Sequence, residues 1–354
     1  MKKRPLLAVL AAIALTSVSA CSGSPAAEPT AASTELSIYA WAGEIPDSVV
    51  KAFEDETGIK VTVDTFDSNE TMISKLAAGD SGYDIVEPSQ YAVQLLVGQD
   101  LIETIDYSKV EGMKNLQTKF VNPSFDADNA HAVPWIWGST GLLYNKKCTG
   151  EDLTSWKSMF DKKYKGKIYM LDNMLASYIV GLQVNGYRAN STNEQEIAKA
   201  TQTLIDQKSL LAGYNSTNYF DFVKSGEACM SLAWGGSQVA KVVAENPDVK
   251  YILPSEGGTL WVDNFSIAKG APHSDAAYKW LNFTLKPETG AMATNEGSLA
   301  TTNEASLALI TDKAQLSNPA IFAPSDQTAN ADFIVDPGKA MTYFQQGWTK
   351  VKAS

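Results

Sequence analysis

The feature that most constrains the fold of this chain is an alternation of strand-like and helix-like segments in its N-terminal part. Glu35 to Trp41 alternates apolar and polar residues as a strand does, and a helix pattern opens at Pro46 and ends at Gly58. The same order of strand and helix then repeats twice, as far as the helix start at Gln90. Strands that alternate with helices indicate βαβ units, so the sequence predicts an α/β protein with parallel strands.

The pattern then changes, which predicts a second lobe. Ala132 to Trp137 and Gly141 to Asn145 are strand-like runs, and we expect a break between them at 138–139. New elements follow, and the chain closes with a helix at 275–285, an irregular stretch at 319–337 and a helix at 339–351. The new elements are helices at 155–160, 174–184, 193–207, 220–222 and 237–244, and strands at 167–171, 229–234 and 250–253. We expect residues 35–138 and 262–305 to form one lobe, and residues 139–261 and 306–354 to form the other.

The N-terminus carries the signals of export. Lys2 to Arg4 is basic, Leu6 to Leu15 is apolar but too short to span a membrane, and small residues then precede Cys21. We expect residues 1–20 to be a signal peptide and Cys21 to carry a lipid that anchors the protein to the outer face of the cell membrane. Residues 21–34, rich in Ser, Ala, Pro and Thr, predict a flexible tether. An ordinary cleaved signal is the alternative.

The charge of the chain limits its partners. It carries 29 Lys and Arg against 40 Asp and Glu, a formal net charge of -11 at pH 7. An acidic protein is a poor partner for nucleic acid and for anionic lipid surfaces, so we expect neither. A cationic ligand is compatible with this charge.

The sequence offers little for catalysis or metal binding. It contains only two histidines, His131 and His273, and none of the short motifs of serine hydrolases, zinc proteases or phosphate-binding loops. Cys148 and Cys229 are not at metal-ligand spacing, and the acids are too many to single out the carboxylate pair of a glycosidase. We therefore expect no enzyme, no cofactor and no metal. Export permits a disulfide, but the sequence leaves the state of the two cysteines open.

Large aromatic residues gather at predicted strand ends. Trp41 and Trp234 each end a strand, and Tyr91 lies just past another. Ligands of open α/β sheets bind at the carboxyl ends of strands, so we expect these rings to face a cleft. The tryptophans on apolar helical faces are expected in the core: Trp156, Trp280 and Trp348. Those at the predicted crossing between lobes could take either place: Trp135 and Trp137.

The stretch from Leu260 to Phe265 combines an aromatic ring with an acid. In a strand, Trp261 and Asp263 share one face, and Val262 takes the other. An indole ring attracts a cation by about 0.5 to 2 kcal/mol, and a carboxylate adds a charge-assisted hydrogen bond. The stretch therefore predicts a seat for a cation. An edge strand with a solvated acid is the alternative.

Several motifs in order resemble the polyamine (spermidine/putrescine) substrate-binding proteins of ABC transporters. The resemblance covers Leu36 to Lys350. Its landmarks are Tyr39-Ala40-Trp41, Glu56 to Val61, Ser68 to Met72, Tyr83 to Ser89, Pro134 to Gly138, Thr154 to Trp156, Trp234 to Ser237 and Glu256 to Asp263. The resemblance implies a two-lobed periplasmic-binding-protein-like fold of type II, with mixed sheets flanked by helices and lobes joined by crossover strands. The positions that match ligand-contacting residues of the family are Trp41, Ser89, Tyr91, Trp234, Trp261 and Asp263.

The sequence also departs from the family pattern. After the first strand the acid is displaced by one residue to Glu44, and the family tyrosine is absent. Two amine-binding carboxylates of the second lobe are replaced by Asn173 and Ala176. A tyrosine expected near Ser298 and a glutamine expected near Ile334 are also missing. A buried ammonium without a carboxylate costs several kcal/mol, so we expect a ligand with fewer charges than spermidine unless Glu44 or Asp172 compensates.

We therefore expect a monomeric, extracytoplasmic lipoprotein that captures a small amine-bearing solute and delivers it to an ABC permease. The expected ligand-binding residues are Trp41, Glu44, Ser89, Tyr91, Asn173, Trp234, Trp261 and Asp263. The alternatives are a binding protein for another solute, such as an amino acid or a quaternary amine, a sensor or adhesin on the same fold, and an extracytoplasmic hydrolase.

Overall fold

The computed structural model describes residues 33–328 and 331–354. Within these ranges, no helix has both the length and the apolar character needed to cross a membrane. The predicted signal peptide, the lipidated Cys21 and most of the predicted tether lie outside the described residues.

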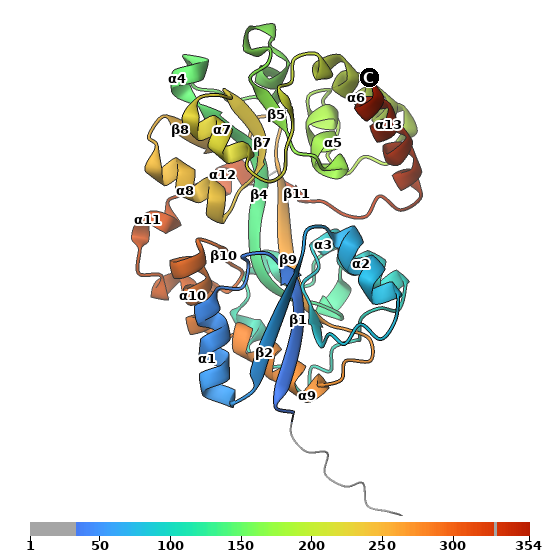
Figure 1. Ribbon diagram of the computed structural model, residues 1–354, viewed down its shortest axis with the longest axis vertical. Coiled ribbons are helices and arrows are strands. Elements are labelled where there is room, and N and C mark those ends of the chain that lie inside the picture. Colours follow the sequence, from blue (N-terminus) through green and yellow to red (C-terminus); the bar gives the residue numbers. More distant parts are fainter. Residues whose placement is uncertain (1–32, 329–330) are drawn as a thin grey trace, which may run out of the picture. The chain divides into compact units, whose positions relative to one another are not determined.

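The strands form one continuous path in the order β2-β1-β3-β9-β4-β7-β5-β6, with β8 and β10 paired to β4, and β11 to β9. Their bounds are β1 (Glu35–Trp41), β2 (Lys60–Phe66), β3 (Ile85–Val86), β4 (Val133–Asn145), β5 (Ile168–Met170), β6 (Gly213–Tyr214), β7 (Met230–Trp234), β8 (Val249–Ile252), β9 (Thr259–Ile267), β10 (Ala300–Thr301) and β11 (Asp332–Phe333). β1, β2 and β3 are parallel, as are β5, β6 and β7. We call the parts built on these two groups the first and the second lobe (Figure 1).

Two long antiparallel strands, β4 and β9, connect the lobes (Figure 1). β9 pairs with β3 at one end and runs along β4, while β4 continues to β7 and β8. The predicted break at Gly138-Ser139 was wrong, because β4 is one strand that is buried at every position. Gly138 lies within this strand, where its lack of a side chain leaves room for the Trp261 ring. A Cβ atom there would lie 2.2 Å from the ring of Trp261 on β9.

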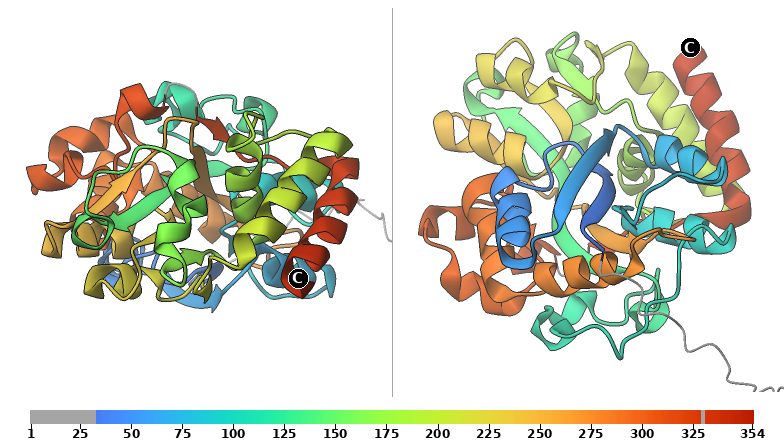
Figure 2. Two further views of the ribbon diagram at one scale, coloured as in Figure 1. Left: turned by 90° about the horizontal axis from the view of Figure 1, so that it is seen from above. Right: turned by 60° about the horizontal axis from the view of Figure 1, so that its bottom comes forward.

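Helices cover both lobes. The α-helices are α1 (Asp47–Thr57), α2 (Asn69–Ala77), α3 (Gln90–Gly98), α4 (Lys146–Thr149), α5 (Met174–Gln183), α6 (Glu194–Lys208), α7 (Tyr219–Ser225), α8 (Ser237–Glu245), α9 (Ser274–Thr284), α10 (Pro287–Gly297), α11 (Lys313–Leu316), α12 (Ser325–Thr328) and α13 (Met341–Ala353). Short 3-10 helices span Met113–Asn115, Thr118–Phe120, Ala127–Asn129, Trp156–Phe160, Lys162–Tyr164, Glu304–Leu309 and Gly338–Ala340. The C-terminal α13 lies along α6 in every view (Figures 1 and 2).

Local signals explain several helix ends. Gly58 ends α1 with a φ of 73°, in the left-handed region that favours glycine, and the Ser68 side chain caps α2 by accepting the Thr71 N–H. The predicted helix at 155–160 is a 3-10 helix. α10 was not predicted, although Pro287 opens it at a position that favours proline. Its composition is mostly small and polar, so it shows little helical periodicity.

The buried apolar residues form two clusters. Trp280, Phe53 and Trp135 pack in one cluster, which lies within the first lobe, and Trp156 lies in the other, which takes residues from both lobes. The prediction that Trp156 and Trp280 belong to the core is confirmed. Trp348 is only half-buried and packs edge-on against Tyr214.

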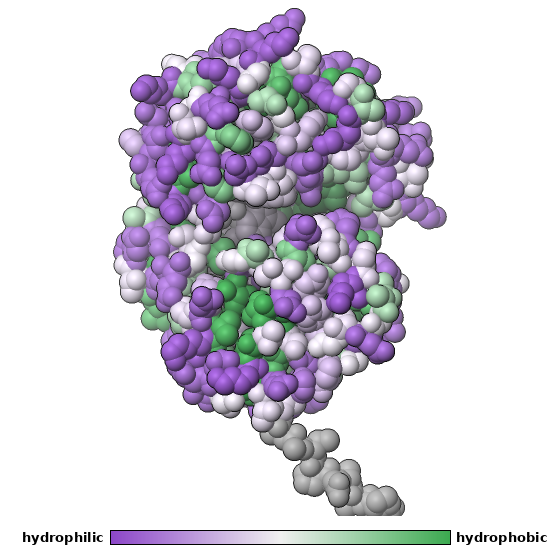
Figure 3. Space-filling model, in the orientation of Figure 1, coloured by the Kyte–Doolittle hydropathy of each residue, from purple (hydrophilic) through white to green (hydrophobic). Residues whose placement is uncertain are grey.

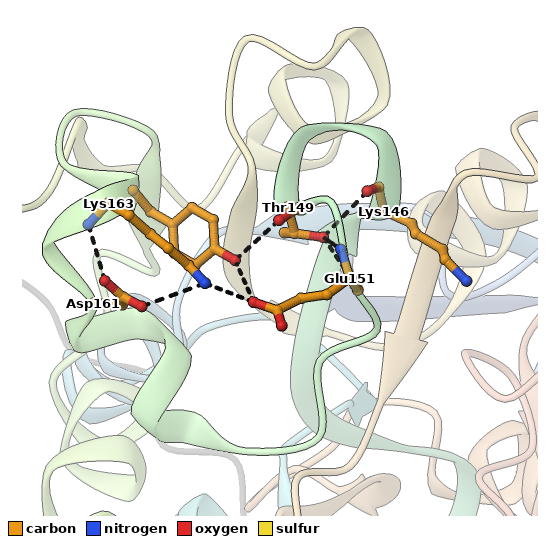
Figure 4. A network of polar contacts seen from close by, with 6 residues as sticks. Lys146, Thr149, Glu151, Asp161 and Lys163 are labelled. Atoms are coloured by element: carbon orange, nitrogen blue, oxygen red, sulfur yellow. Dashed lines mark hydrogen bonds and ion pairs between the residues drawn. The ribbon is translucent and has the colours of Figure 1, made fainter.

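Cys148 and Cys229 form a disulfide, with their Cα atoms 5.1 Å apart. The bridge ties the short helix α4 to the residue before β7. A surface network lies in the same region (Figure 4). There, Lys163 bonds Glu151 at 2.6 Å, and the Thr149 hydroxyl donates to the Glu151 carbonyl at 2.7 Å. These polar groups satisfy one another's hydrogen bonds, so we assign the network a structural role.

Candidate functional site

Asp263 is the centre of the candidate site, because it is a buried acid on a strand that joins the lobes. β9 alternates as predicted, with Val262 fully buried and Trp261 half-buried on the opposite face. Asp263 is only 4% exposed, and its Oδ1 accepts a hydrogen bond of 2.6 Å from the Ser89 hydroxyl. An isolated antiparallel bridge also pairs the backbones of Ser89 and Asp263. The backbone thus places the two side chains together.

Ser89 and Tyr91 are held by the start of α2. The Ser89 N–H donates to Asn69 Oδ1 at 3.2 Å, and Asn69 Nδ2 donates to the Tyr91 hydroxyl at 3.0 Å. That hydroxyl in turn donates to Glu70 at 3.4 Å, and burial, followed by the charge of Glu70, raises its pKa. The Tyr91 hydroxyl therefore forms its hydrogen bonds within the first lobe, and only the half-buried ring remains to contact a ligand.

Glu44 lies in the turn after β1. Gly43 has a φ of 83°, which favours glycine, and the Glu44 carbonyl accepts the Trp135 indole N–H at 3.1 Å. The Glu44 carboxyl lies close enough to Asp263 for the charge of that residue to raise the pKa of Glu44, and its Oε2 is buried without a hydrogen-bond partner. The displacement of this acid in the sequence therefore still leaves it beside Asp263.

Glu87 is a site residue that the sequence analysis missed. It follows β3 directly and is 0% exposed. Its Oε2 accepts the Trp41 backbone N–H at 3.0 Å, whereas its Oε1 is buried without a hydrogen-bond partner. An acid between the apolar Ile85-Val86 and Pro88 was the available signal, because a buried strand rarely ends in an acid unless that acid has a partner.

Trp41 lies against the same acids. Its ring packs on Phe66 with centroids 4.6 Å apart and is half-buried. Its indole Nε1 is buried and has no hydrogen-bond partner, although it lies near enough to Asp263 to lower the pKa of that carboxyl. The ring thus brings an apolar face and an unused donor to the site.

Burial dominates the protonation of the three acids Glu44, Glu87 and Asp263, which we call the acid cluster. It raises the pKa of Asp263 to about 7, although the Ser89 hydroxyl and the nearby Glu44 carboxyl and Trp41 indole act in the opposite direction. Burial, and then the charge of Asp263, raises the pKa of Glu44 and that of Glu87 well above the usual range of a glutamate. The neighbouring groups that act on these pKa values are acids, a hydroxyl, an indole and the Trp41 backbone N–H, and among the described residues no basic side chain contributes.

Trp261 and Trp234 flank the junction of the lobes. The Trp261 indole donates to the Ser139 carbonyl at 3.2 Å, and its ring lies over Gly138 and beside Gly236. Trp234 ends β7 half-buried, two residues before Gly236. Both residues lie on strands that pair with β4, so the structure brings them together along that strand. The surface of the molecule is hollowed between the two lobes (Figure 3).

Asn173 and Asp172 lie at the start of α5 in the second lobe, and neither is seen to contact the acid cluster. Asn173 Oδ1 accepts the Ala176 N–H at 2.9 Å and so caps the helix. Asp172 bonds Lys352 of α13 at 2.7 Å. The chain itself therefore neutralises Asp172, and of the two acids considered as replacements only Glu44 lies by Asp263.

The described ranges contain no group of three or more His, Cys, Asp and Glu side chains that could hold a metal ion. The histidines are half-buried rather than free on the surface. His131 bonds Asp126 at 3.2 Å, and His273 bonds Asp84 at 3.1 Å, and both aspartates are buried.

Comparisons with known proteins agree on one family. Residues 48–323 match the model described as bacterial extracellular solute-binding protein. The spermidine/putrescine-binding periplasmic protein of Escherichia coli K12 is 31% identical over 321 residues, which cover 90% of this chain and 91% of that protein. Spermidine/putrescine-binding periplasmic protein 1 of Haemophilus influenzae is 31% identical over 364 residues and the full length of both chains.

A solved structure shows the same fold. The spermidine/putrescine ABC transporter substrate-binding protein PotD of Streptococcus pneumoniae superimposes with a TM-score of 0.78 at 27% identity. The match covers 90% of this chain and 100% of that one. The two-lobed, type II fold predicted from the sequence is thereby confirmed.

Proposed function

Because the chain belongs to the bacterial extracellular solute-binding protein family, we propose that it captures a small amine-bearing solute and delivers it to an ABC permease. The observation that carries the proposal is Asp263, a carboxylate 4% exposed that accepts a hydrogen bond from a hydroxyl and lies beside another acid rather than a basic group. A buried carboxylate is costly unless a positive charge pairs with it. A cationic ligand supplies that charge.

The aromatic residues suit the rest of such a ligand. Trp41, Trp234 and Trp261 are half-buried around the same junction. Each methylene buried against such rings contributes about 0.8 kcal/mol, so the chain length of the ligand sets much of its affinity. Binding closes the lobes over the ligand by bending at β4 and β9, and the permease recognises the closed form.

The second lobe favours a ligand with fewer positive charges than spermidine. Ala176 replaces one family carboxylate, Asn173 replaces another and caps α5, and Asp172 is paired with Lys352. Putrescine, or a compound with one amine and a neutral or anionic far end, meets this arrangement without burying an unpaired ammonium.

The proposal includes the location and the domain boundaries. The protein is a monomer tethered by a lipid on Cys21 outside the cell membrane. Its lobes consist of residues 35–138 with 262–305 and of residues 139–261 with 306–354. Mass spectrometry of the protein from the membrane fraction tests the anchor by detecting the lipid on Cys21. We expect a Cys21→Ser variant to lack the lipid and to be released from the membrane.

Calorimetric titration tests the choice of ligand. We expect putrescine to bind more tightly than spermidine. Spermidine that binds at or below about 1 μM, and more tightly than putrescine and every monoamine, would refute the reduced-charge part of the proposal. Failure of every cationic amine to bind would refute the proposed function itself.

A further inference from the structure

Glu87 is locked in place at the carboxyl end of β1. Its backbone N–H donates to the Tyr39 carbonyl at 3.0 Å, and its Oε2 accepts the Trp41 N–H at 3.0 Å. Both bonds continue the pairing of β1 with β3, whose carboxyl ends lie at one edge of the sheet. The side chain therefore cannot turn toward solvent without breaking a hydrogen bond at the end of the strand.

Polar atoms of this edge remain without partners. Glu87 Oε1 and Glu44 Oε2 are buried acceptors, and Trp41 Nε1 is a buried donor, and none has a hydrogen-bond partner among the described residues. Few buried polar groups in folded proteins stay unpaired, and each one costs stability. Two unpaired carboxyl oxygens beside Asp263 indicate that a donor from outside the chain completes the site.

We propose that Glu87 is a third acid of the cation seat, so that Glu44, Glu87 and Asp263 together bind one nitrogen that carries several N–H groups, and that binding releases a proton to solvent. This inference rests on the proposed function and names the class of ligand. The nitrogen belongs to a primary ammonium or a guanidinium group.

The donor count selects this class. A primary ammonium offers three N–H donors and a guanidinium five, which suffices for the free oxygens of the acid cluster. A quaternary ammonium offers none, so it would leave these acceptors buried and unpaired despite its charge. A site made only of aromatic rings would accept a quaternary amine. The acid cluster therefore distinguishes N–H cations from quaternary ones.

The proton release follows from the crowding of like charges. Buried carboxyls that lie close together cannot all be ionised, so some keep their protons until a cation arrives. The raised pKa values of Glu44, Glu87 and Asp263 agree with this. Tyr91 and Glu70 are the other titratable groups that face the cluster, and Glu70 adds negative charge rather than relieving it. When the nitrogen enters, an O–H bond of the cluster breaks and its proton passes to the buffer.

Titration calorimetry of the full chain with putrescine in buffers of different ionisation enthalpy tests the inference. The wild type should release protons on binding, and its affinity should rise with pH from about 6 to about 8. Glu87→Gln keeps an acceptor for the Trp41 N–H but removes the acid. It should weaken binding about ten- to hundredfold and release fewer protons. Tetramethylammonium should not bind measurably to the wild type.

The matched control is Glu54→Gln. Glu54 also accepts a backbone N–H, that of Val61 at 3.0 Å, but it lies on α1 away from the cluster, so affinity and proton release should not change. Glu87→Asp serves as a second variant if Glu87→Gln does not fold. It keeps the acid, so proton release should persist while affinity falls.

The outcomes separate this inference from the function on which it rests. One outcome overturns the role of Glu87 alone. In it, Asp263→Asn abolishes putrescine binding, but Glu87→Gln binds putrescine and releases protons as the wild type does. Tight binding of tetramethylammonium overturns the proposed ligand class. If no cation binds to the wild type, the proposed function fails, and the inference fails with it.

Discussion

In the proposed function, the environment of Asp263 favours ligand binding at the expense of stability. The residue is 4% exposed, beside a hydroxyl and two further acids. Removing a carboxylate from water costs several kcal/mol unless a positive charge compensates, and in the proposed function the ligand supplies that charge. The ligand-free protein therefore carries an unfavourable interaction that binding relieves, as is common at functional sites.

Asp263→Asn should have opposite effects on binding and on stability. The amide keeps an acceptor for the Ser89 hydroxyl but loses the charge, so affinity for any cationic ligand should fall at least about tenfold. Without ligand at neutral pH, the variant should unfold at a higher temperature than the wild type, because no buried carboxylate ionises. Calorimetric titration and thermal melts check the two effects. An unchanged Kd would contradict the role of Asp263.

At the scale of elements, β4 and β9 carry both the connection between lobes and part of the site. Trp261 reaches across the pair to bond the Ser139 carbonyl, and this requires that the facing residue on β4 has no side chain. α5 and α13 act together in the second lobe, since the Asp172–Lys352 pair joins the start of one to the end of the other. Contacts between elements thus decide which family carboxylates remain available.

Gly138→Ala should displace the Trp261 ring. The added Cβ would lie 2.2 Å from that ring, and relieving the clash should cost about 1 to 3 kcal/mol of stability and weaken ligand binding. Gly98→Ala is the control, because a Cβ there has no neighbour within 4 Å. Chemical denaturation and calorimetric titration measure both effects. Wild-type affinity in Gly138→Ala would show that the position of Trp261 does not matter.

Asn173→Asp should shift selectivity toward the more highly charged polyamine. Aspartate caps a helix as well as asparagine does and restores an acid that the family has, so spermidine affinity should rise severalfold relative to putrescine. The control is Asn193→Asp, which makes the same change at the N-terminus of α6, where Asn193 accepts the Gln195 N–H at 2.9 Å. In that variant the ratio of spermidine affinity to putrescine affinity should stay constant. Competition titrations of the two ligands provide the measurement. If the affinity for spermidine relative to putrescine is the same in both variants, Asn173 does not contact the ligand.

At the scale of the whole molecule, stability and ligand occupancy depend on pH together. In the native state the pKa of Asp263 is about 7, against 3.8 as the ordinary value. Between these two values the native state holds a proton that the unfolded state has lost. The free energy of unfolding therefore falls as pH rises through this window. A bound cation lowers the pKa and removes the penalty.

The ligand-free protein should therefore lose stability as pH rises from about 4 to about 7. Asp263 alone accounts for on the order of 4 kcal/mol, and the raised pKa values of Glu44 and Glu87 act in the same direction. Denaturant unfolding at a series of pH values measures this, with Asp263→Asn as the control that should show a shallower dependence. A stability that rises over the whole window would contradict the buried acid cluster.

Local order was readable from the sequence by itself. The bounds of β1, the start and end of α1, and the shared face of Trp261 and Asp263 were all predicted, because backbone periodicity and helix-end signals act over a few residues. The family landmarks also predicted the two-lobed fold. They identified Ser89 and Asp263, which the structure brings within a hydrogen bond of each other.

Only the tertiary structure decided which distant residues meet. It made β4 one strand, joined Cys148 to Cys229, paired Asp172 with Lys352 and set Glu87 beside Trp41. The physical reason is that each of these contacts depends on how strands and helices far apart in the chain pack. The local sequence does not show whether an acid will contact water, a lysine or two other acids. The acid cluster, to which we assign the ligand specificity as a proposal, is a product of that packing.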